Sequence, residues 1–318
     1  MRAVVTGGTG HLGSYLVPCL VKAGYEVICI SRGERGAYTQ EDPTWAEVEF
    51  RSADRRAMEA EGKFGEFVAS LRPDLICDLI SYTPAQAEQI VAPFLERPTR
   101  FIQIGTIWVY EYKITVPVTE EHPHTERRPN SYGHNKTLIE NYLLGLTREN
   151  KLAATVINPG HISAREWLPI NPQGNLDLKV WTKLLSGQKL LLPNDGQATL
   201  HHVHSDDLAR LILCCLEQPE NSVGETFNAV CNEAITLRGY AEGVAAHFGK
   251  KAVLEFAAWP EFEKQLRTDD ANASYDHVRR SPCCSMEKAR RKLGFEPRET
   301  SLSIAAAAVE WHRERGIL

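Results

Sequence analysis

Two side chains suited to proton transfer, Tyr132 and Lys136, stand four residues apart in the segment SYGHNK at positions 131–136. On a helix, residues at this spacing project from one face, one turn apart. A nearby ammonium stabilises a tyrosinate and lowers the pKa of the phenol from about 10 toward neutral pH. The pair therefore indicates acid/base chemistry on a substrate hydroxyl or carbonyl. The alternative is an unrelated pair on a solvated helix.

A glycine-rich turn near the N-terminus has the spacing of a dinucleotide-binding site. The segment TGGTGHLG at positions 6–13 follows an apolar run and opens into a helical pattern. Glycines there permit a tight turn and let backbone amides approach a pyrophosphate at the positive helix N-terminus. The residues that we expect to contact the cofactor are Gly7, Gly10, His11, Leu12 and Gly13.

The end of the second expected strand indicates which dinucleotide binds. A site that prefers NAD carries an acidic residue there, against the adenosine ribose hydroxyls. Here Ser31 and Arg32 offer a hydroxyl and a guanidinium to a 2′-phosphate. We therefore expect NADP to be preferred over NAD, the alternative being that Arg32 is a solvated surface residue. Asp54, after the third strand, either accepts from the adenine amino group or caps its loop.

A parallel sheet would position these motifs, and the first half of the chain has that pattern. Short apolar, β-branched runs alternate there with helical patterns. The expected strands are Ala3–Val5, Glu26–Ile30, Glu47–Phe50, Leu75–Leu79, Phe101–Ile104 and Ala154–Ile157. The second half offers a strand near Lys189–Leu192 and helices at Leu178–Leu185, Asp206–Leu216, Leu237–Phe248, Met286–Leu293 and Leu302–Arg315.

The pattern predicts an α/β fold, a Rossmann-type doubly wound parallel sheet with a smaller C-terminal α/β substrate domain. The dinucleotide-binding Rossmann domain would cover residues 1–165, with returning segments near 200–232. Residues 166–318 would form the mainly substrate-binding domain.

Further motifs, in order along nearly the whole chain, resemble those of the extended branch of the short-chain dehydrogenase/reductases, the NAD(P)-dependent epimerase/dehydratase group. The run FIQIGTIWVY at 101–110 looks like the family's strand that ends in a catalytic Ser or Thr. The segment NPGH at 158–161 resembles its proline–glycine segment beside the nicotinamide, and HVHSDD at 202–207 its hydrophobic-valine-aspartate motif. Three further segments resemble its C-terminal landmarks: FN at 227–228, EKA at 287–289 and LGF at 293–295.

This resemblance implies roles for particular residues. Tyr132 would be the acid/base, and Lys136 would bind the nicotinamide ribose and tune Tyr132. The hydroxyl of Thr106 would be a hydrogen-bond partner of the reacting oxygen. Pro159 and His161 would lie beside the nicotinamide. The implied reaction is that of an NAD(P)-dependent epimerase or oxidoreductase acting on a secondary alcohol or ketone of a sugar or sugar derivative. The alternatives are a nucleotide-sugar epimerase with a shifted diphosphate site and a non-catalytic cofactor- or RNA-binding protein of the same fold.

The chain departs from the family at three places. Asp78 stands in a segment where the family often has a histidine followed by small residues, so the floor of the nicotinamide pocket is unusual. Ile107 and Trp108 replace the Asp-Glu pair of sugar-nucleotide dehydratases, which disfavours dehydration. Leu200 replaces an arginine that many relatives use for the substrate diphosphate. The substrate-binding candidates are Tyr82, His161, Trp167, Arg267 and Arg279.

Composition restricts the partners. The 36 basic and 41 acidic side chains leave a net charge of −5, which argues against nucleic acid. The eight cysteines lack CxxC spacing, and no signal peptide or apolar run of about 18 residues is recognisable. We therefore expect a cytoplasmic protein without a membrane or metal partner, with a small carbohydrate-like substrate. A homodimer is left open.

Overall fold

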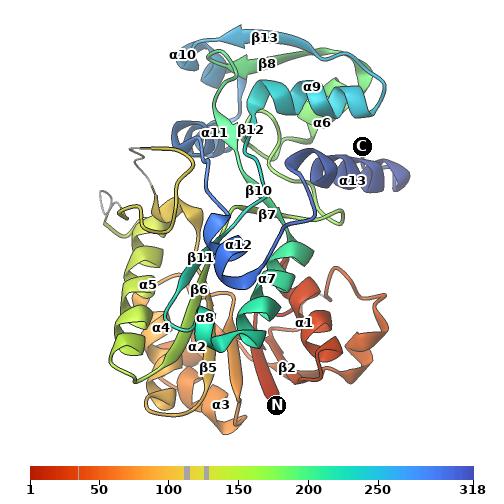
Figure 1. Ribbon diagram of the computed structural model, residues 1–318. Helices are drawn as coiled ribbons and strands as arrows, with labels where there is room; N and C mark the ends of the chain where they lie inside the picture. The colour runs from red at the N-terminus through yellow and green to blue at the C-terminus, as the bar shows by residue number, and fades with distance from the viewer. Residues whose placement is uncertain (35, 111–114, 125–128) are drawn as a thin grey trace.

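The computed structural model describes residues 1–318 apart from 35, 111–114 and 125–128. Its main element is a seven-stranded parallel sheet with the order β11-β6-β5-β4-β1-β2-β3 (Figure 1). The strands are β1 (Arg2–Thr6), β2 (Glu26–Ser31), β3 (Glu49–Ser52), β4 (Leu75–Asp78), β5 (Arg100–Ile104), β6 (Ala153–Pro159) and β11 (Thr226–Ala229). The strand order reverses between β1 and β4, which opens a crevice at the carboxyl ends of the strands. The predicted doubly wound sheet is confirmed.

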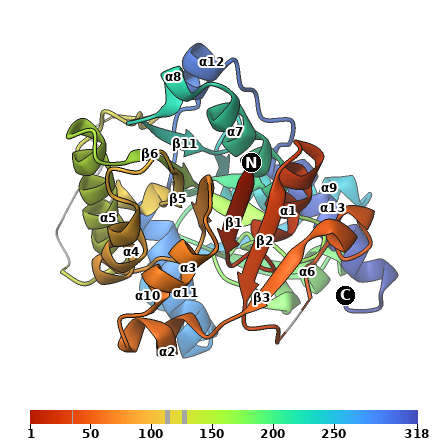
Figure 2. The ribbon, with the colours of Figure 1, turned by 90° about the horizontal axis from the view of Figure 1, so that it is seen from below.

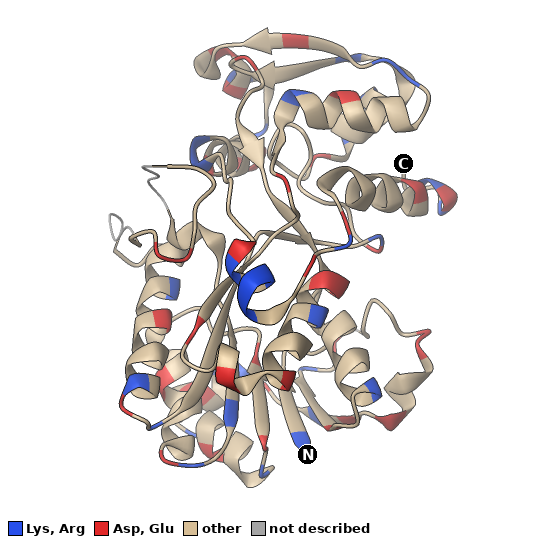
Figure 3. Cartoon of the chain, viewed as in Figure 1, with Lys and Arg blue, Asp and Glu red and all other residues tan. Residues whose placement is uncertain are grey.

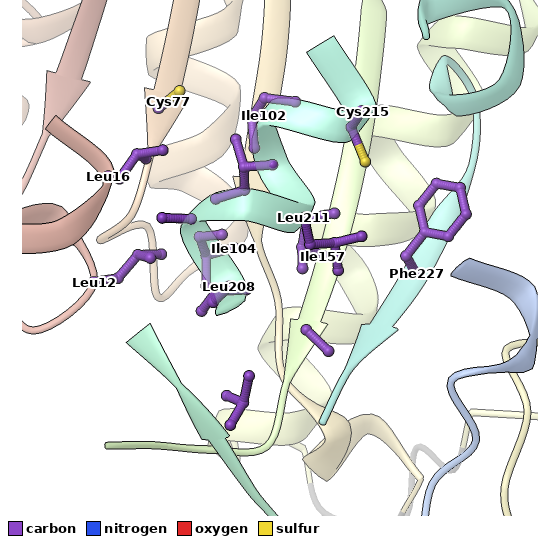
Figure 4. Close-up of a cluster of buried hydrophobic side chains, with 14 of the residues drawn as sticks. Leu12, Leu16, Cys77, Ile102, Ile104, Ile157, Leu208, Leu211, Cys215 and Phe227 are labelled. Carbon is purple, nitrogen blue, oxygen red and sulfur yellow. The ribbon is translucent and has the colours of Figure 1, made fainter. Parts of the chain in front are cut away.

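Helices cover both faces of this sheet (Figure 2). On one face lie α1 (Gly13–Lys22) and α7 (Ser205–Glu217), and on the other α3 (Phe64–Ser70), α4 (Pro84–Val91) and α5 (Tyr132–Arg148). Figure 4 shows Leu16 of α1 and Leu208 and Leu211 of α7 packed toward Ile102 and Ile157 of the sheet. Because both faces are buried, inner strands such as β1, β2 and β6 are nearly continuous apolar runs, whereas the edge strand β3 is largely exposed.

The C-terminal elements form a second, smaller layer with its own core, drawn at the top of Figure 1. It holds α6 (Leu178–Ser186), β8 (Lys189–Pro193), α9 (Leu237–His247), β13 (Val253–Ala257), α10 (Trp259–Phe262), α11 (Thr268–Arg280) and α13 (Ser301–Glu314). Strands β8 and β13 pair in parallel. Trp181, Tyr240 and Leu200 are buried in this core. Leu200, which stands where many relatives carry an arginine, therefore packs in the core of this layer.

Short elements connect the two parts, because the chain crosses between them several times. Strands β7 (His161–Ser163) and β10 (His202–His204) pair in parallel, and β9 (Thr199–Leu200) pairs antiparallel with β12 (Ile235–Thr236). Helices α8 (Pro219–Ser222) and α12 (Glu287–Leu293) return to the sheet beside β11. The buried carboxylate of Asp207 accepts the backbone amides of Arg298 and Glu299 at 2.9–3.0 Å and so ties α7 to the segment before α13.

Most predicted elements occur within two residues of their expected bounds, including β3, which begins two residues later than predicted. Helix α11 was not predicted, because its sequence, TDDANASYDHVRR, lacks an apolar stripe of helical period. Figure 3 shows basic and acidic residues interspersed along the chain, with one basic cluster on α12. None of the described helices is long and apolar enough to cross a bilayer.

Candidate active site

A cavity of about 330 Å³ opens at the carboxyl ends of β4, β5 and β6. The structure brings many of the candidate residues together around it. Its lining residues are His11, Leu79, Tyr82, Ile104, Gly105, Thr106, Ile107, Trp108, Tyr132, Lys136, Pro159, Gly160, His161 and Ile162. Ligands of open parallel sheets bind at this edge.

Tyr132 is the first residue of α5, which Ser131 caps by accepting the His134 amide at 3.3 Å. Tyr132 is 41% exposed, and its edge packs on Trp108 with ring centroids 6.0 Å apart. Tyr132 lines the cavity, and its removal from water there raises the pKa of Tyr132 to about 12, against the effect of a hydrogen bond with Thr106. The expected lowering by Lys136 is therefore wrong for this structure, since removal of the phenol from water and then the neighbouring Tyr82 both raise the pKa of Tyr132.

Lys136 lies one turn further along α5 and is 2% exposed. Its ammonium donates to the carbonyl oxygens of Ser81 at 2.7 Å and Ile104 at 2.6 Å, where β4 and β5 end. The Nζ atom also lies 5.2 Å from the ring centroid of Tyr82 and 5.7 Å from that of Tyr132. Burial lowers the pKa of Lys136 from 10.5 to about 8. An ammonium has three donors, so one remains for a ligand hydroxyl.

Thr106 follows β5 and caps the short 3-10 helix Ile107–Val109, since its hydroxyl accepts the Trp108 amide at 3.2 Å. Its own amide donates to Oδ1 of Asn158 at 2.8 Å. Sequence reasoning missed Asn158 as a site residue, although it lies in the Asn-Pro segment that was singled out. It also missed Glu140, to which the Asn158 amide group donates at 3.1 Å.

Beneath the cavity, Asp78 forms a buried ion pair with Arg55, the first residue of α2 (Arg55–Ala60). Arg55 Nη1 donates to Asp78 Oδ1 at 2.8 Å, and the hydroxyls of Thr6 and Ser81 also donate to this carboxylate. Burial opposes ionisation, but Arg55 holds the pKa of Asp78 below its ordinary value. The unusual residue of the pocket floor is therefore a stable anion whose counterion comes from the turn after β3.

The glycine turn has the shape that a pyrophosphate needs. Gly7 has a φ of +78°, and a Cβ there would lie 2.6 Å from Ile80. A Cβ on Gly13 would lie 2.4 Å from the Gly8 carbonyl oxygen, so the start of α1 packs directly on the turn. The Gly10 amide closes the turn on the Gly7 carbonyl at 3.0 Å. The first amides of a helix lack intrahelical acceptors, so these residues fit a dinucleotide. The side chain of Leu12 is buried in the core, which leaves its backbone for this role.

Trp167 lies beside this turn, outside the residues that line the cavity. Its ring stacks on His11 with centroids 4.1 Å apart and planes 9° apart, and His11 Nε2 lies 3.0 Å from the Tyr38 hydroxyl. The neighbouring Glu166 accepts from the Tyr15 hydroxyl of α1 at 2.7 Å. A substrate contact for Trp167 remains a prediction.

The candidates for the adenosine end lie at the surface. Ser31 ends β2, and Arg32 forms an ion pair with Glu34 at 3.1 Å in which both side chains are 64% exposed. Asp54 caps α2 by accepting the Ala57 amide at 3.2 Å. The capping alternative thus has a structural counterpart, and the adenine contact remains a prediction.

The candidate arginines of the C-terminal part differ in position. Arg267 is 80% exposed and lies 3.7 Å from Asp270. Arg279 pairs with Asp276 at 3.1 Å. Arg280 also pairs with Asp276, at 2.9 Å, and stacks 4.0 Å from the Trp108 ring. Among the described residues that line the cavity, Lys136 is the only one with a Lys or Arg side chain.

His161 brings an uncharged imidazole to the cavity. Its ring lies 4.7 Å from that of His277 and 5.6 Å from that of His202. Burial, followed by these two histidines, holds the pKa of His161 well below its ordinary value. His201 instead bonds the Cys231 carbonyl at 2.8 Å and the Cys284 amide at 3.1 Å. The described residues contain no group of three His, Cys, Asp or Glu side chains arranged to hold a metal ion.

Comparison with known proteins places this arrangement in a family. Residues 3–229 match the NAD dependent epimerase/dehydratase family. A 2'-dehydrokanamycin reductase of Streptomyces kanamyceticus is 25% identical over 65% of this chain and 55% of its own length. A UDP-glucose 4-epimerase of Drosophila melanogaster is 26% identical over 70% of this chain and 74% of its own.

Solved structures share the fold over nearly the entire chain. A UDP-glucose 4-epimerase of Thermotoga maritima, with UDP-glucose, has a TM-score of 0.74 at 22% identity and 99% coverage of both chains. A dTDP-glucose 4,6-dehydratase of Bacillus anthracis, in complex with NAD, has a TM-score of 0.74 at 21% identity, covering 99% of this chain and 97% of that one. The predicted family, and with it the prediction of an enzyme fold that binds a nicotinamide dinucleotide, is confirmed by the family match. The chain belongs to the NAD dependent epimerase/dehydratase family.

Proposed function

We propose that this protein is an NAD(P)-dependent oxidoreductase or epimerase that acts on a secondary alcohol or ketone of a sugar or sugar derivative. The observation that carries the proposal is the convergence of Thr106, Tyr132 and Lys136 on one cavity beside the glycine turn. A bound nicotinamide dinucleotide would supply the hydride acceptor or donor. The chain's own residues then bind, orient and move the proton.

Tyr132 is the proton donor in the direction of ketone reduction. With a pKa of about 12, its phenol keeps its proton at neutral pH, and the Thr106 hydroxyl orients it. Lys136 is largely protonated at pH 7, because its pKa is about 8. Two of its donors hold the backbone at the ends of β4 and β5, and the third is offered to a ribose hydroxyl of the cofactor. Pro159 and His161 line the cavity and would lie beside the nicotinamide when the cofactor is bound.

NADP is the proposed cofactor, with NAD as the alternative. Support comes from Ser31 and Arg32, which follow β2 without an acidic residue at that point. The ion pair of Arg32 with Glu34 is fully at the surface, and such pairs contribute less than about 1 kcal/mol. A 2′-phosphate, with two negative charges, therefore competes well for this guanidinium.

The proposed substrate is a carbohydrate without a nucleotide. The described cavity lining offers the single cation Lys136, and both of its nearest acceptors are backbone carbonyls. Burying a diphosphate without cationic partners would cost several kcal/mol. The resemblance to a 2'-dehydrokanamycin reductase favours reduction of a ketone.

A nucleotide-sugar epimerase is the second candidate, favoured by the UDP-glucose 4-epimerase relatives. Its diphosphate would have to reach Arg267, Arg279 or Arg280 in a shifted position. Micromolar calorimetric binding of UDP, GDP or dTDP that is lost in Arg279→Ala or Arg267→Ala would establish this candidate instead. Nucleotide released from the denatured protein separates the reactions, since an epimerase retains its cofactor and a reductase exchanges it.

The remaining proposals concern the setting of the enzyme. Cys19, Cys29, Cys77, Cys214, Cys215 and Cys231 are free thiols, which is consistent with a reducing cytoplasm. We place the protein there, with a small-molecule substrate and without nucleic acid or membrane partners, and keep a homodimer as the alternative to a monomer.

The test is Tyr132→Phe, measured on the ketosugar that the wild type reduces fastest with NADPH in a panel of free and nucleotide-linked sugars. Turnover should fall by about 10²–10⁴-fold, because only the ionisable hydroxyl is removed. The cofactor Kd should stay within about three-fold, because the ring remains. The matched control is Tyr142→Phe, on the same helix but outside the cavity lining. Activity that survives in Tyr132→Phe would refute the assignment.

A further inference from the structure

A chain of hydrogen bonds links Glu140, on the face of α5 that carries Tyr132 and Lys136, to Thr106 after β5. Tyr132, Lys136 and Glu140 follow one another at intervals of four residues, so all three project from one face of α5. Tyr132 and Lys136 reach the cavity, whereas Glu140 points below it and is 5% exposed. The proposed reaction gives Glu140 no role.

The buried carboxylate of Glu140 accepts hydrogen bonds from side chains of two different strands. Oε2 accepts from Asn158 Nδ2 of β6 at 3.1 Å, and Oε1 accepts from the Thr226 hydroxyl of β11 at 2.8 Å. His124 Nε2 lies 3.7 Å from the same Oε1. Because a carboxylate only accepts, it fixes which way the Asn158 amide points.

Asn158 passes this orientation to Thr106. With Nδ2 turned to Glu140, Oδ1 faces the Thr106 amide and accepts from it at 2.8 Å. The contact is tight, since a Cβ on the preceding Gly105 would lie 1.9 Å from Oδ1 of Asn158. Asn158 is fully buried. Each of its polar side-chain atoms already has a protein partner.

Thr106 lies at the same cavity as the proposed catalytic tyrosine. Its backbone is extended, with φ −170° and ψ 146°, and its hydroxyl accepts the Trp108 amide at 3.2 Å. A rotated Asn158 amide would set a donor against the Thr106 amide and displace this residue. Reacting groups misplaced by about 1 Å can lose about 100-fold in rate.

We propose that Glu140 and Asn158 are positioning residues, which fix the Thr106 hydroxyl against Tyr132 through an amide orientation set by the buried carboxylate. They touch neither substrate nor cofactor. The inference rests on the proposed function, in which Thr106 and Tyr132 act on the substrate.

The test exchanges donor and acceptor between the two positions. Asn158→Asp keeps an acceptor for the Thr106 amide but places the new carboxylate against that of Glu140. Glu140→Gln alone leaves a carbonyl oxygen for Thr226 and an amide group beside Asn158. The Asn158→Asp/Glu140→Gln double variant restores one donor and one acceptor with the direction reversed. Each protein is compared at a temperature well below its own midpoint of unfolding, with the ketosugar substrate and NADPH.

We expect kcat to fall by about 10–100-fold in Asn158→Asp and to return to within about three-fold of wild type in the double variant. The KM for the sugar and the Kd for NADPH should stay within about three-fold throughout, because no binding group is changed. A purely structural role would lower the melting temperature but would not separate kcat from KM. Equal losses in the single and double variants overturn the inference.

A second measurement needs no substrate. In protein labelled with ¹⁵N-threonine, amide exchange at Thr106 should be slow in the wild type, faster in Asn158→Ala, and unchanged in the control Thr182→Ser, which lies on the surface of α6. Unchanged exchange in Asn158→Ala refutes the positioning contact. If Tyr132→Phe retains activity while Thr106 exchange responds as expected, the proposed function fails and the positioning contact stands.

Discussion

The ion pair between Arg55 and Asp78 makes a quantitative prediction about stability. Arg55 is 7% exposed and Asp78 fully buried, and their closest atoms lie 2.8 Å apart. Removing one partner strands the other charge in the interior, which costs about 3–5 kcal/mol. At about 2.1 cal/mol/K per residue, the unfolding entropy of 318 residues is about 0.7 kcal/mol/K. Asp78→Ala should therefore lower the melting temperature by about 4–8 °C.

Thermal and urea unfolding at pH 7 measure this loss, and a double-mutant cycle with Arg55→Met isolates the pair. The double variant should be less destabilised than the sum of the singles, because it buries no unpaired charge. Since the folded pKa of Asp78 is lowered, its contribution is present above the ordinary aspartate pKa, and the difference from Asp78→Ala should shrink as the pH falls below about 4. Glu242→Ala, in an exposed pair with Arg238, is the control and should cost under about 1 kcal/mol. Additive losses, or a single variant costing no more than Glu242→Ala, would refute the reasoning.

Two further substitutions test the cofactor site. Lys136→Met should weaken NADPH binding by about 10-fold and abolish turnover, since it removes the remaining donor for the ribose and the two hydrogen bonds to the backbone beside the cavity. Because the folded pKa of Lys136 is lowered to about 8, the wild type carries a penalty at neutral pH that disappears as the pH rises from 8 to 10.5. The stability difference from Lys136→Met should change over that window by at most about 3 kcal/mol, and a flat difference in urea titrations would show that the ammonium is not buried at a cost. Arg32→Ala should weaken NADPH binding by about 10–100-fold, from an arginine–phosphate bond of about 1.5–3 kcal/mol, and leave NADH binding within about three-fold. Equal losses for both cofactors in fluorescence titrations would mean that Arg32 does not meet the 2′-phosphate.

The sheet was predictable because its inner strands are buried on both faces. Apolar runs such as LICD at 75–78 and ATVI at 154–157 are short, rich in branched side chains and separated by helical patterns, so local sequence and global fold agree. The Tyr132–Lys136 pair was predictable for a similar reason, since the helical period alone puts both side chains on one face. Thr106 came from resemblance, and the structure then set it within the same cavity.

What could not be predicted depends on contacts between distant segments. Arg55 opens a polar helix 23 residues before Asp78, and neither position carries a local signal of the other. The stacking of Trp167 on His11 likewise joins the turn after β7, bridged between Ala164 and Trp167, to the glycine turn, and neither segment indicates the other. The period of a helix or strand says which face a residue occupies, not which residue of another element it meets.

The pKa of Tyr132 could not be predicted from the sequence either, because it depends on burial and on where the neighbouring ammonium points. The spacing of Tyr132 and Lys136 predicted attraction between an ammonium and a tyrosinate, and hence a lowered pKa. In the structure the ammonium donates to two carbonyl oxygens, and removal of the phenol from water raises the pKa of Tyr132 instead. Each group is thereby held near the protonation state that ketone reduction requires, with Tyr132 as a phenol and Lys136 as a cation. The acid/base chemistry thus depends less on the spacing of the pair than on the backbone at the ends of β4 and β5, which fixes where the ammonium points.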